Sequence, residues 1–208
     1  MFDHVKIHVA DLQASERFYA TVLAAIDIRQ DVSDAGEARW AEFAIAAAAG
    51  AAAVTRRLHI GFAAASRAKV DAFWRAGIAG GARDDGAPGP RPQYAPEYYG
   101  AFLLDPDGNS AEAVHHDGLR GGGVIDHLWI RVADVPAATA FYDTIAQRTG
   151  LRAAEVRADY ARFEGASATF SLVPVEPTRH LHMAFPARGD AAVMLDPDGN
   201  TIELCRRN

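Results

Sequence analysis

The chain has 208 residues, of which half are apolar and 23% are charged, and this composition excludes an intrinsically disordered protein. Its net charge of -6 argues against a nucleic-acid partner, because binding to a phosphate backbone needs a basic surface. A single cysteine, Cys205, excludes an intramolecular disulfide and fits a reducing compartment.

No secretory or membrane segment is evident in the sequence. The N-terminus begins directly with MFDHVKIHV and lacks the basic region and apolar core of a signal peptide. The longest apolar run, residues 43–54, is too short to span a bilayer. We therefore expect a cytoplasmic protein with no membrane partner.

The first elements in chain order predict a strand, a helix and further strands. Apolar residues alternate in DHVKIHV (3–9), which predicts a half-buried strand. Helical spacing in SERFYATVLAAI (15–26) predicts a helix that packs Phe18 and Val22. Two or three strands are expected next, around residues 26–32, 38–46 and 51–55.

A second series of the same kind begins with RLHIGF at residues 57–62. A helix is predicted within residues 65–83, where Gly80 and Gly81 close it. Residues 84–100 are too rich in proline and glycine for regular structure, so we expect a loop there at the rim of the sheet.

The chain then repeats itself. Residues 126–144 are identical to residues 3–21 at ten of nineteen positions, and RLHIGFAA matches HLHMAFPA at the same offset of 123. The two LDPDGN turns are offset by only 91, so the second copy lacks 32 residues (123 − 91) between His182 and Asp196. The missing part is the helix and loop of the first copy.

These observations predict an α+β fold made of paired βαβββ modules in tandem, with the second copy truncated in its last module. The predicted domains are residues 1–117 and 123–208, joined by the linker HHDGLRGGG, where His115 and His116 are expected to be solvated.

Two histidines and one glutamate recur at matching places in both copies. Each histidine stands on a first strand, and each glutamate lies in the strand after a DPDGN turn, always on the face opposite the apolar residues. Two imidazoles and a carboxylate can hold three positions of iron(II), manganese, zinc or nickel. The predicted metal ligands are His4, His59 and Glu112, with a second and weaker set of His127, His182 and Glu203.

The openings DHVKIHVADLQASERFYATVL and DHLWIRVADVPAATAFYDTI and the returns LDPDGNSAE and LDPDGNTIE resemble the vicinal oxygen chelate superfamily. This group includes glyoxalase I, extradiol dioxygenases and the fosfomycin and bleomycin resistance proteins. The resemblance implies cup-shaped half-barrels and a divalent metal, Fe²⁺ as the first choice, that chelates neighbouring oxygens of a small-molecule substrate.

The resemblance leaves the reaction open. Glyoxalase I implies a fourth ligand, a glutamate on the last strand of the first module, but AAAAGAAAV contains no acid, so classical glyoxalase I is disfavoured. A lyase, an isomerase or an extradiol-type dioxygenase is expected instead. The alternative is a non-catalytic protein that sequesters a drug or metabolite, as bleomycin resistance proteins do. The expected assembly is a monomer or a homodimer.

Further candidates line the predicted first cup. By analogy with extradiol enzymes, His8 and Tyr99 are the catalytic candidates. Lys6 faces the cup by alternation, and the proline-rich loop can bring three more side chains to substrate. The predicted substrate-binding residues are Lys6, Arg91, Tyr94 and Tyr98.

Overall fold

The computed structural model describes residues 1–119 and 121–206, and the elements fall into four successive modules. The first module contains β1 (His4–Val9), α1 (Leu12–Ala24), β2 (Val32–Ser33), β3 (Glu37–Trp40) and β4 (Phe43–Ala47). The second contains β5 (His59–Ala63), α2 (Arg67–Ala79), β6 (Arg83–Pro90), β7 (Tyr99–Leu104) and β8 (Ser110–His115).

The third module has the same order, and the fourth is shortened. The third contains β9 (Ile125–Val132), α3 (Val135–Thr149), β10 (Arg152–Arg157), β11 (Tyr160–Glu164) and β12 (Thr169–Pro174). The fourth contains β13 (His182–Ala187), β14 (Ala192–Leu195) and β15 (Thr201–Arg206). No helix lies between β13 and β14 among the described residues, so the predicted truncation of the last module is confirmed.

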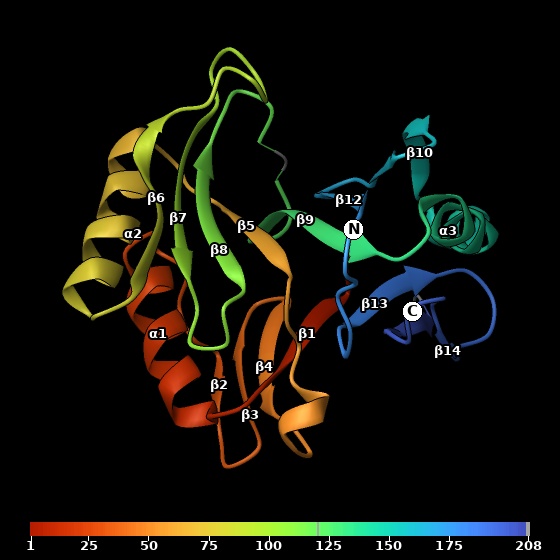
Figure 1. The fold of residues 1–208 in the computed structure, drawn as a ribbon, viewed down its shortest axis with the longest axis horizontal. Coiled ribbons are helices and arrows are strands. Elements are labelled where there is room, and N and C mark those ends of the chain that lie inside the picture. The colour runs from red at the N-terminus through yellow and green to blue at the C-terminus, as the bar shows by residue number, and fades with distance from the viewer. Residues whose placement is uncertain (120, 207–208) are drawn as a thin grey trace.

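The strands form two open sheets, which confirms the predicted α+β class. Sheet I is eight-stranded, in the order β10-β11-β12-β9-β5-β8-β7-β6, and sheet II is seven-stranded, in the order β14-β15-β13-β1-β4-β3-β2. Figure 1 shows α1 and α2 side by side at one flank of the molecule and α3 at the opposite flank.

The sheets do not follow the sequence repeat. Sheet I joins the second module to the third through the antiparallel pair β5–β9, and sheet II joins the first to the fourth through β1–β13. Each sheet therefore takes one module from each copy. The proposed division into domains 1–117 and 123–208 describes the repeat, and whether either unit folds alone stays a prediction.

Local sequence explains the boundaries of the helices and the faces of the strands. Asp11 and Asp134 accept hydrogen bonds from the backbone N–H groups of Ala14 and Ala137, so they cap α1 and α3 in the same way. In β1 the apolar residues are buried and His4, Lys6 and His8 are partly exposed, as alternation predicts. One core fills the space between the sheets and the helices, and its largest buried side chains include Trp40, Tyr19, Tyr142, Phe43 and Phe62.

The two DPDGN turns hold the same network of hydrogen bonds. Asp105 accepts from the backbone N–H groups of Asp107 and Asn109 and from the hydroxyl of Tyr19. The Asn109 side chain accepts from the Leu58 N–H and donates to the Thr55 carbonyl, which ties the turn to the start of β5. Asp196, Asn200 and Tyr142 repeat these contacts in the second copy.

Three predicted elements are wrong in detail. The strand expected at residues 26–32 is only the two-residue β2, at Val32–Ser33. Residues 84–100 are not all loop, because β6 extends to Pro90 and pairs with β7 through an irregular register that accommodates Gly86 and Gly89. The predicted strand at 51–55 is instead a short 3₁₀ turn at Ala51–Ala53, since the small residues there have no sheet partner. Among the described residues, every helix falls short of the length and apolarity needed to cross a bilayer.

Candidate metal centre

Three potential ligands meet on sheet I: His59 from β5, Glu112 from β8 and His127 from β9 (hereafter cluster I). His59 Nε2 lies 2.9 Å from Glu112 Oε2 and 3.1 Å from His127 Nε2. His127 Nε2 lies 3.2 Å from the same carboxylate oxygen. The three donor atoms thus form a nearly equilateral triangle.

Strand register and one glycine bring these side chains together. Gly61 of β5 is opposite Glu112 in β8 and opposite His127 in β9. A Cβ atom at Gly61 would overlap the His127 imidazole, with Nε2 only 2.8 Å away. Gly61 therefore leaves the space that the His127 ring occupies.

The second nitrogen of each histidine is held by its own partner. His127 Nδ1 donates to Asp126 Oδ2 at 2.8 Å. His59 Nδ1 lies 3.1 Å from the hydroxyl of Ser110, which donates to Asp85 at 2.7 Å. Such contacts fix the ring orientation, as is usual for metal-binding histidines.

Opposite charges dominate the electrostatics of cluster I. Burial by itself would raise the pKa of Glu112, which is 1% exposed, but His127 and His59 outweigh it and lower that pKa to about 2. Burial opposes a charge on His127 as well, yet Asp126 and Glu112 raise its pKa to about 10. The two carboxylates therefore favour positive charge at His127, and a metal ion bound there would displace its Nε2 proton.

A second group lies on sheet II: His4 from β1, His182 from β13 and Glu203 from β15 (hereafter cluster II). His182 Nε2 lies 3.0 Å from Glu203 Oε2, and the His4 and His182 rings are 5.0 Å apart between centroids. All three side chains of cluster II are partly exposed, whereas Glu112 and His127 in cluster I are buried.

The structure brings together the six predicted ligands in a different grouping. The sequence places His4 with His59 and Glu112, and His127 with His182 and Glu203. In the structure His4 and His127 exchange places, because β1 pairs with β13 and β5 pairs with β9. Metal ligation itself stays a prediction for both clusters.

Register also identifies what occupies the fourth position of each cluster. Glu112 of β8 is opposite Gly61, which lies two residues after His59. The equivalent residue beside His127 is opposite Trp129, two residues after that histidine, and it is Ser171 of β12. In sheet II the equivalent residue, opposite Lys6, is Ala44. Neither is an acid, so each cluster has three ligand candidates rather than four.

Aromatic side chains surround cluster I. The His59 ring lies 5.9 Å from Trp129 and 5.8 Å from Phe102, and Tyr94 packs edge-on against Trp129. Tyr98 donates a hydrogen bond of 2.8 Å to Glu112 Oε1. Burial and the nearby Glu112 charge raise the pKa of Tyr98, so its hydroxyl keeps its proton.

The structure places Tyr99, Lys6 and His8 away from cluster I, whereas Arg91 lies behind Phe102, one of the rings beside it. The hydroxyl of Tyr99 donates to Asp71 of α2, because adjacent residues of β7 face opposite sides of the sheet. Lys6 and His8 lie on sheet II, where Lys6 pairs with Glu37 at 2.5 Å and His8 Nδ1 contacts the His180 carbonyl. Arg91 packs over the Phe102 ring and donates to the carbonyls of Pro90 and Ala87.

Two residues beside the site were missed or misjudged from sequence. Asp126 precedes His127 as Asp3 precedes His4, and this recurring Asp-His pair is the signal that could have revealed its role. His116 does not lie in a solvated linker: it stacks on Tyr98 at 5.5 Å and contacts Asp126 at 3.2 Å. Its position depends on how the linker folds back, which sequence spacing does not reveal.

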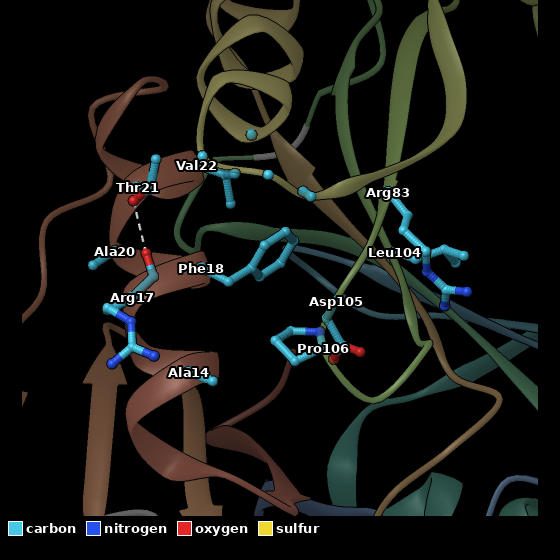
Figure 2. A pocket seen from close by; sticks show the side chains of 14 residues that line it. Ala14, Arg17, Phe18, Ala20, Thr21, Val22, Arg83, Leu104, Asp105 and Pro106 are labelled. Atoms are coloured by element: carbon cyan, nitrogen blue, oxygen red, sulfur yellow. Dashed lines mark hydrogen bonds between the residues drawn. The ribbon is translucent and has the colours of Figure 1, made fainter.

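A cavity of about 700 Å³ lies elsewhere, between α1, the end of α2 and the first DPDGN turn. Figure 2 shows Phe18 and Pro106 facing this space and Arg17 and Arg83 on opposite sides of it. Its only acid, Asp105, already accepts hydrogen bonds from Tyr19 and Asn109. Neither candidate ligand group shares a residue with the lining of this cavity.

Comparison with known proteins identifies related families and folds. The family model described as Glyoxalase/Bleomycin resistance protein/Dioxygenase superfamily matches residues 1–113. A glyoxalase/bleomycin resistance protein from Albidiferax ferrireducens T118 is 35% identical, covering 56% of this chain and 99% of its own, with a TM-score of 0.51. A search of curated proteins gives no match.

One solved structure matches nearly the whole length of this chain. Glyoxalase I from Zea mays has a TM-score of 0.67 and covers 99% of this chain and 92% of its own, at 15% identity. At that identity the likeness concerns the fold alone, and it extends across both copies of the repeat.

Proposed function

Because the chain belongs to the Glyoxalase/Bleomycin resistance protein/Dioxygenase superfamily, we propose that it is a metal-dependent enzyme acting on a small molecule at cluster I. His59, Glu112 and His127 would hold the metal. Cluster I carries this proposal better than cluster II, because its acid and one of its histidines are buried and both imidazoles have oriented second nitrogens.

The donor set fits a divalent ion. Ligand bonds of about 2.1 Å that meet at right angles put neighbouring donor atoms roughly 3 Å apart. The three donor atoms of cluster I are separated by 2.9, 3.1 and 3.2 Å. Two imidazoles and one carboxylate are the set favoured by non-haem iron(II), so Fe²⁺ is the first choice, with Mn²⁺, Zn²⁺ and Ni²⁺ as alternatives.

When bound, such an ion supplies a Lewis acid that stabilises negative charge on neighbouring substrate oxygens. The residues of the chain bind and orient the substrate around it. The rings of Trp129, Phe102 and Tyr94 offer flat apolar walls, and Tyr98 presents a protonated hydroxyl beside Glu112. Tyr98 therefore replaces Tyr99 as the candidate to hold or move a proton.

The missing fourth acid supports a choice among the reactions of the family. Ser171 lies where a fourth carboxylate would stand and is hydrogen-bonded to Tyr160, so three protein ligands leave positions open for substrate. This favours a lyase, an isomerase or an extradiol-type dioxygenase over a four-ligand glyoxalase I.

Metal binding tests the proposal directly. In a His182→Ala background, which disables cluster II, we expect one equivalent of metal when apoprotein is loaded with Fe²⁺, Mn²⁺, Zn²⁺ or Ni²⁺ in turn. Adding His127→Ala should abolish it, whereas adding His8→Ala, a matched histidine outside cluster I, should leave it intact. Failure to retain any of the four ions would refute the enzyme proposal.

That failure would favour the alternative function. A protein that sequesters a drug or metabolite would bind its ligand between the rings of Trp129, Phe102 and Tyr94, without metal. Binding that survives a chelator, without turnover, is the result that distinguishes it.

A further inference from the structure

The cavity between α1, the end of α2 and the first DPDGN turn has an apolar floor and a basic rim. Val22 is buried in the floor, and Phe18 and Leu104 are partly exposed there. Arg17 and Arg83 are exposed, and Figure 2 shows them on opposite sides of the space. The volume of about 700 Å³ is within the range of small-molecule sites.

The guanidinium groups of the two rim arginines are available to a ligand. Within the described part of the chain, neither the Arg17 nor the Arg83 guanidinium takes part in a hydrogen bond or an ion pair. The adjacent acids have other partners. Glu16 accepts hydrogen bonds from two side chains beyond α1, and Asp84 accepts one from a tryptophan of α2. The rim therefore presents two positive charges.

The one acid of the lining does not offset these charges. Asp105 is 2% exposed, and each of its carboxylate oxygens already accepts two hydrogen bonds, from the turn and from Tyr19. Among the described residues that line the cavity, none is a histidine or a cysteine. The cavity is therefore suited to hold an anion, and it offers no imidazole, thiol or free carboxylate for catalysis.

The internal repeat provides a comparison within the same molecule. At the offset of 123, Phe18 of α1 recurs as Phe141 of α3, but Arg17 is replaced by Ala140. Among its described residues the fourth module contains no helix, so the wall that α2 supplies in the first copy is absent from the second. The arginine is thus present only in the copy that has both walls of the cavity.

We propose that this cavity binds a small molecule that carries an acidic group at each end of an apolar body, such as an α,ω-dicarboxylate. Arg17 and Arg83, on opposite sides, would each hold one carboxylate, since the guanidinium fork matches that group. The apolar body would lie against Phe18, Val22 and Leu104. This inference does not depend on the proposed function, because neither cluster shares a residue with the lining.

Suberate is the probe, with octanoate and octanediol as ligands that have the same chain but one charge and none. Each is titrated into the full-length chain in the presence of a chelator, and the methyl resonances of Leu104 report binding. We expect suberate to bind about three- to tenfold more tightly than octanoate, because each exposed charged contact contributes modestly. A purely apolar cavity would give the opposite order. The exposed Leu195 of β14 should show no shift.

Two substitutions test the rim. Arg17→Ala, which copies the residue of the repeat, and Arg83→Ala should each lower the affinity for suberate to that for octanoate. Arg188→Ala removes an exposed arginine outside the lining and should leave the affinity for suberate unchanged, although the net charge changes equally.

Three results would overturn the proposal: no shift of Leu104 with suberate or the longer sebacate, tighter binding of octanoate than of suberate, or unchanged suberate affinity after both rim substitutions. Failure of metal binding at cluster I would leave these titrations unaffected, because they are performed with a chelator. The two proposals therefore fail separately.

Discussion

Asp126 contacts two histidines at once, and its position determines how His127 presents its other nitrogen. It accepts from His127 Nδ1 at 2.8 Å and lies 3.2 Å from His116 Nε2. Burial would raise the pKa of Asp126, but hydrogen bonds and charges from both histidines lower it, so the carboxylate stays ionised. We infer that Asp126 orients His127 and does not itself contact metal.

Asp126→Asn should therefore weaken metal binding at cluster I by about 10–100-fold, because outer contacts of this kind are worth that much in other sites. The affinity is measured by chelator competition in the His182→Ala background. Asp3→Asn, the equivalent change beside His4, is the control and should leave this affinity unchanged. Equal affinities for wild-type and Asp126→Asn sites would contradict the positioning role.

Sequence alone identified all six ligand candidates because the repeat marks each of them. A histidine lies at or near the start of four strands, and an acid follows each DPDGN turn in both copies. The supporting residues were harder to find, since Asp126, Ser110 and His116 act through contacts that depend on neighbouring strands. Tyr98 and Tyr99 illustrate the limit: one residue of register decides which of them faces the site.

At the scale of elements, hydrogen bonds account for the presence of a DPDGN turn in each copy. Asp105 and Asp196 are nearly buried, and each accepts from a buried tyrosine, Tyr19 at 2.9 Å and Tyr142 at 3.0 Å. Each turn thereby links the last strand of a module to the helix of the preceding one.

Tyr19→Phe and Tyr142→Phe should each lower the free energy of unfolding by about 1–2 kcal/mol, since a buried carboxylate loses a donor. Chemical denaturation with the linear extrapolation method measures the change. Tyr160→Phe removes a hydroxyl that contacts Ser171 at a partly buried site, and it should cost less. A larger loss of unfolding free energy from Tyr160→Phe than from the other two changes would contradict the stabilising role given to the turns.

A charged contact between β1 and β3 gives a pH-dependent prediction. Glu37 lies 2.5 Å from Lys6 Nζ and 2.6 Å from an Arg39 nitrogen. Burial would raise the pKa of Glu37, but the hydrogen bonds to Lys6 and Arg39 outweigh it and lower the pKa below 4.5. The contact therefore stabilises the fold above pH 4.5 and is lost as the pH falls through the lowered pKa.

Glu37→Gln should lower Tm by roughly 1–3 °C at pH 7, and this difference should disappear near pH 3. Thermal unfolding of both proteins across that range tests it, with Glu97→Gln as a control whose partner, Arg67, lies in an exposed pair. A Tm difference that persists at low pH would show that Glu37 acts through packing rather than charge.

Element order was predictable because alternation, helical spacing and turn residues are local signals. The failures lie where the signal is not local. Residues 84–90 form β6 despite their proline and glycine, because β7 offers a partner edge. Residues 51–53 form only a 3₁₀ turn because no strand is available to them.

At the scale of the whole molecule, the repeat reports which residues are equivalent but not which strands pair. Asp3-His4 and Asp126-His127 are equivalent, so sequence alone offers either histidine to His59 and Glu112. The structure uses His127, because β5 pairs with β9 across the two copies. Each candidate cluster thus takes its residues from both copies of the unit.

The exchange of His4 and His127 between the two clusters predicts how residues 1–117 behave without the second copy. A fragment of residues 1–117 exposes the edges of β1 and β5 that β13 and β9 cover in the full chain. Because the two copies are equivalent, we expect two fragments to associate, with β1 of each replacing β9 of the other. His4 of one fragment would then stand beside His59 and Glu112 of its partner.

The expected product is a homodimer with two metal sites, seen by analytical ultracentrifugation and elemental analysis. His4→Ala in the fragment should abolish metal binding, whereas His4→Ala in the full chain should leave cluster I intact, since His127 fills that place. A monomeric fragment that still binds metal would contradict the exchange. The same substitution thus has opposite consequences in the two proteins, because the third ligand of the site comes from whichever copy pairs with β5.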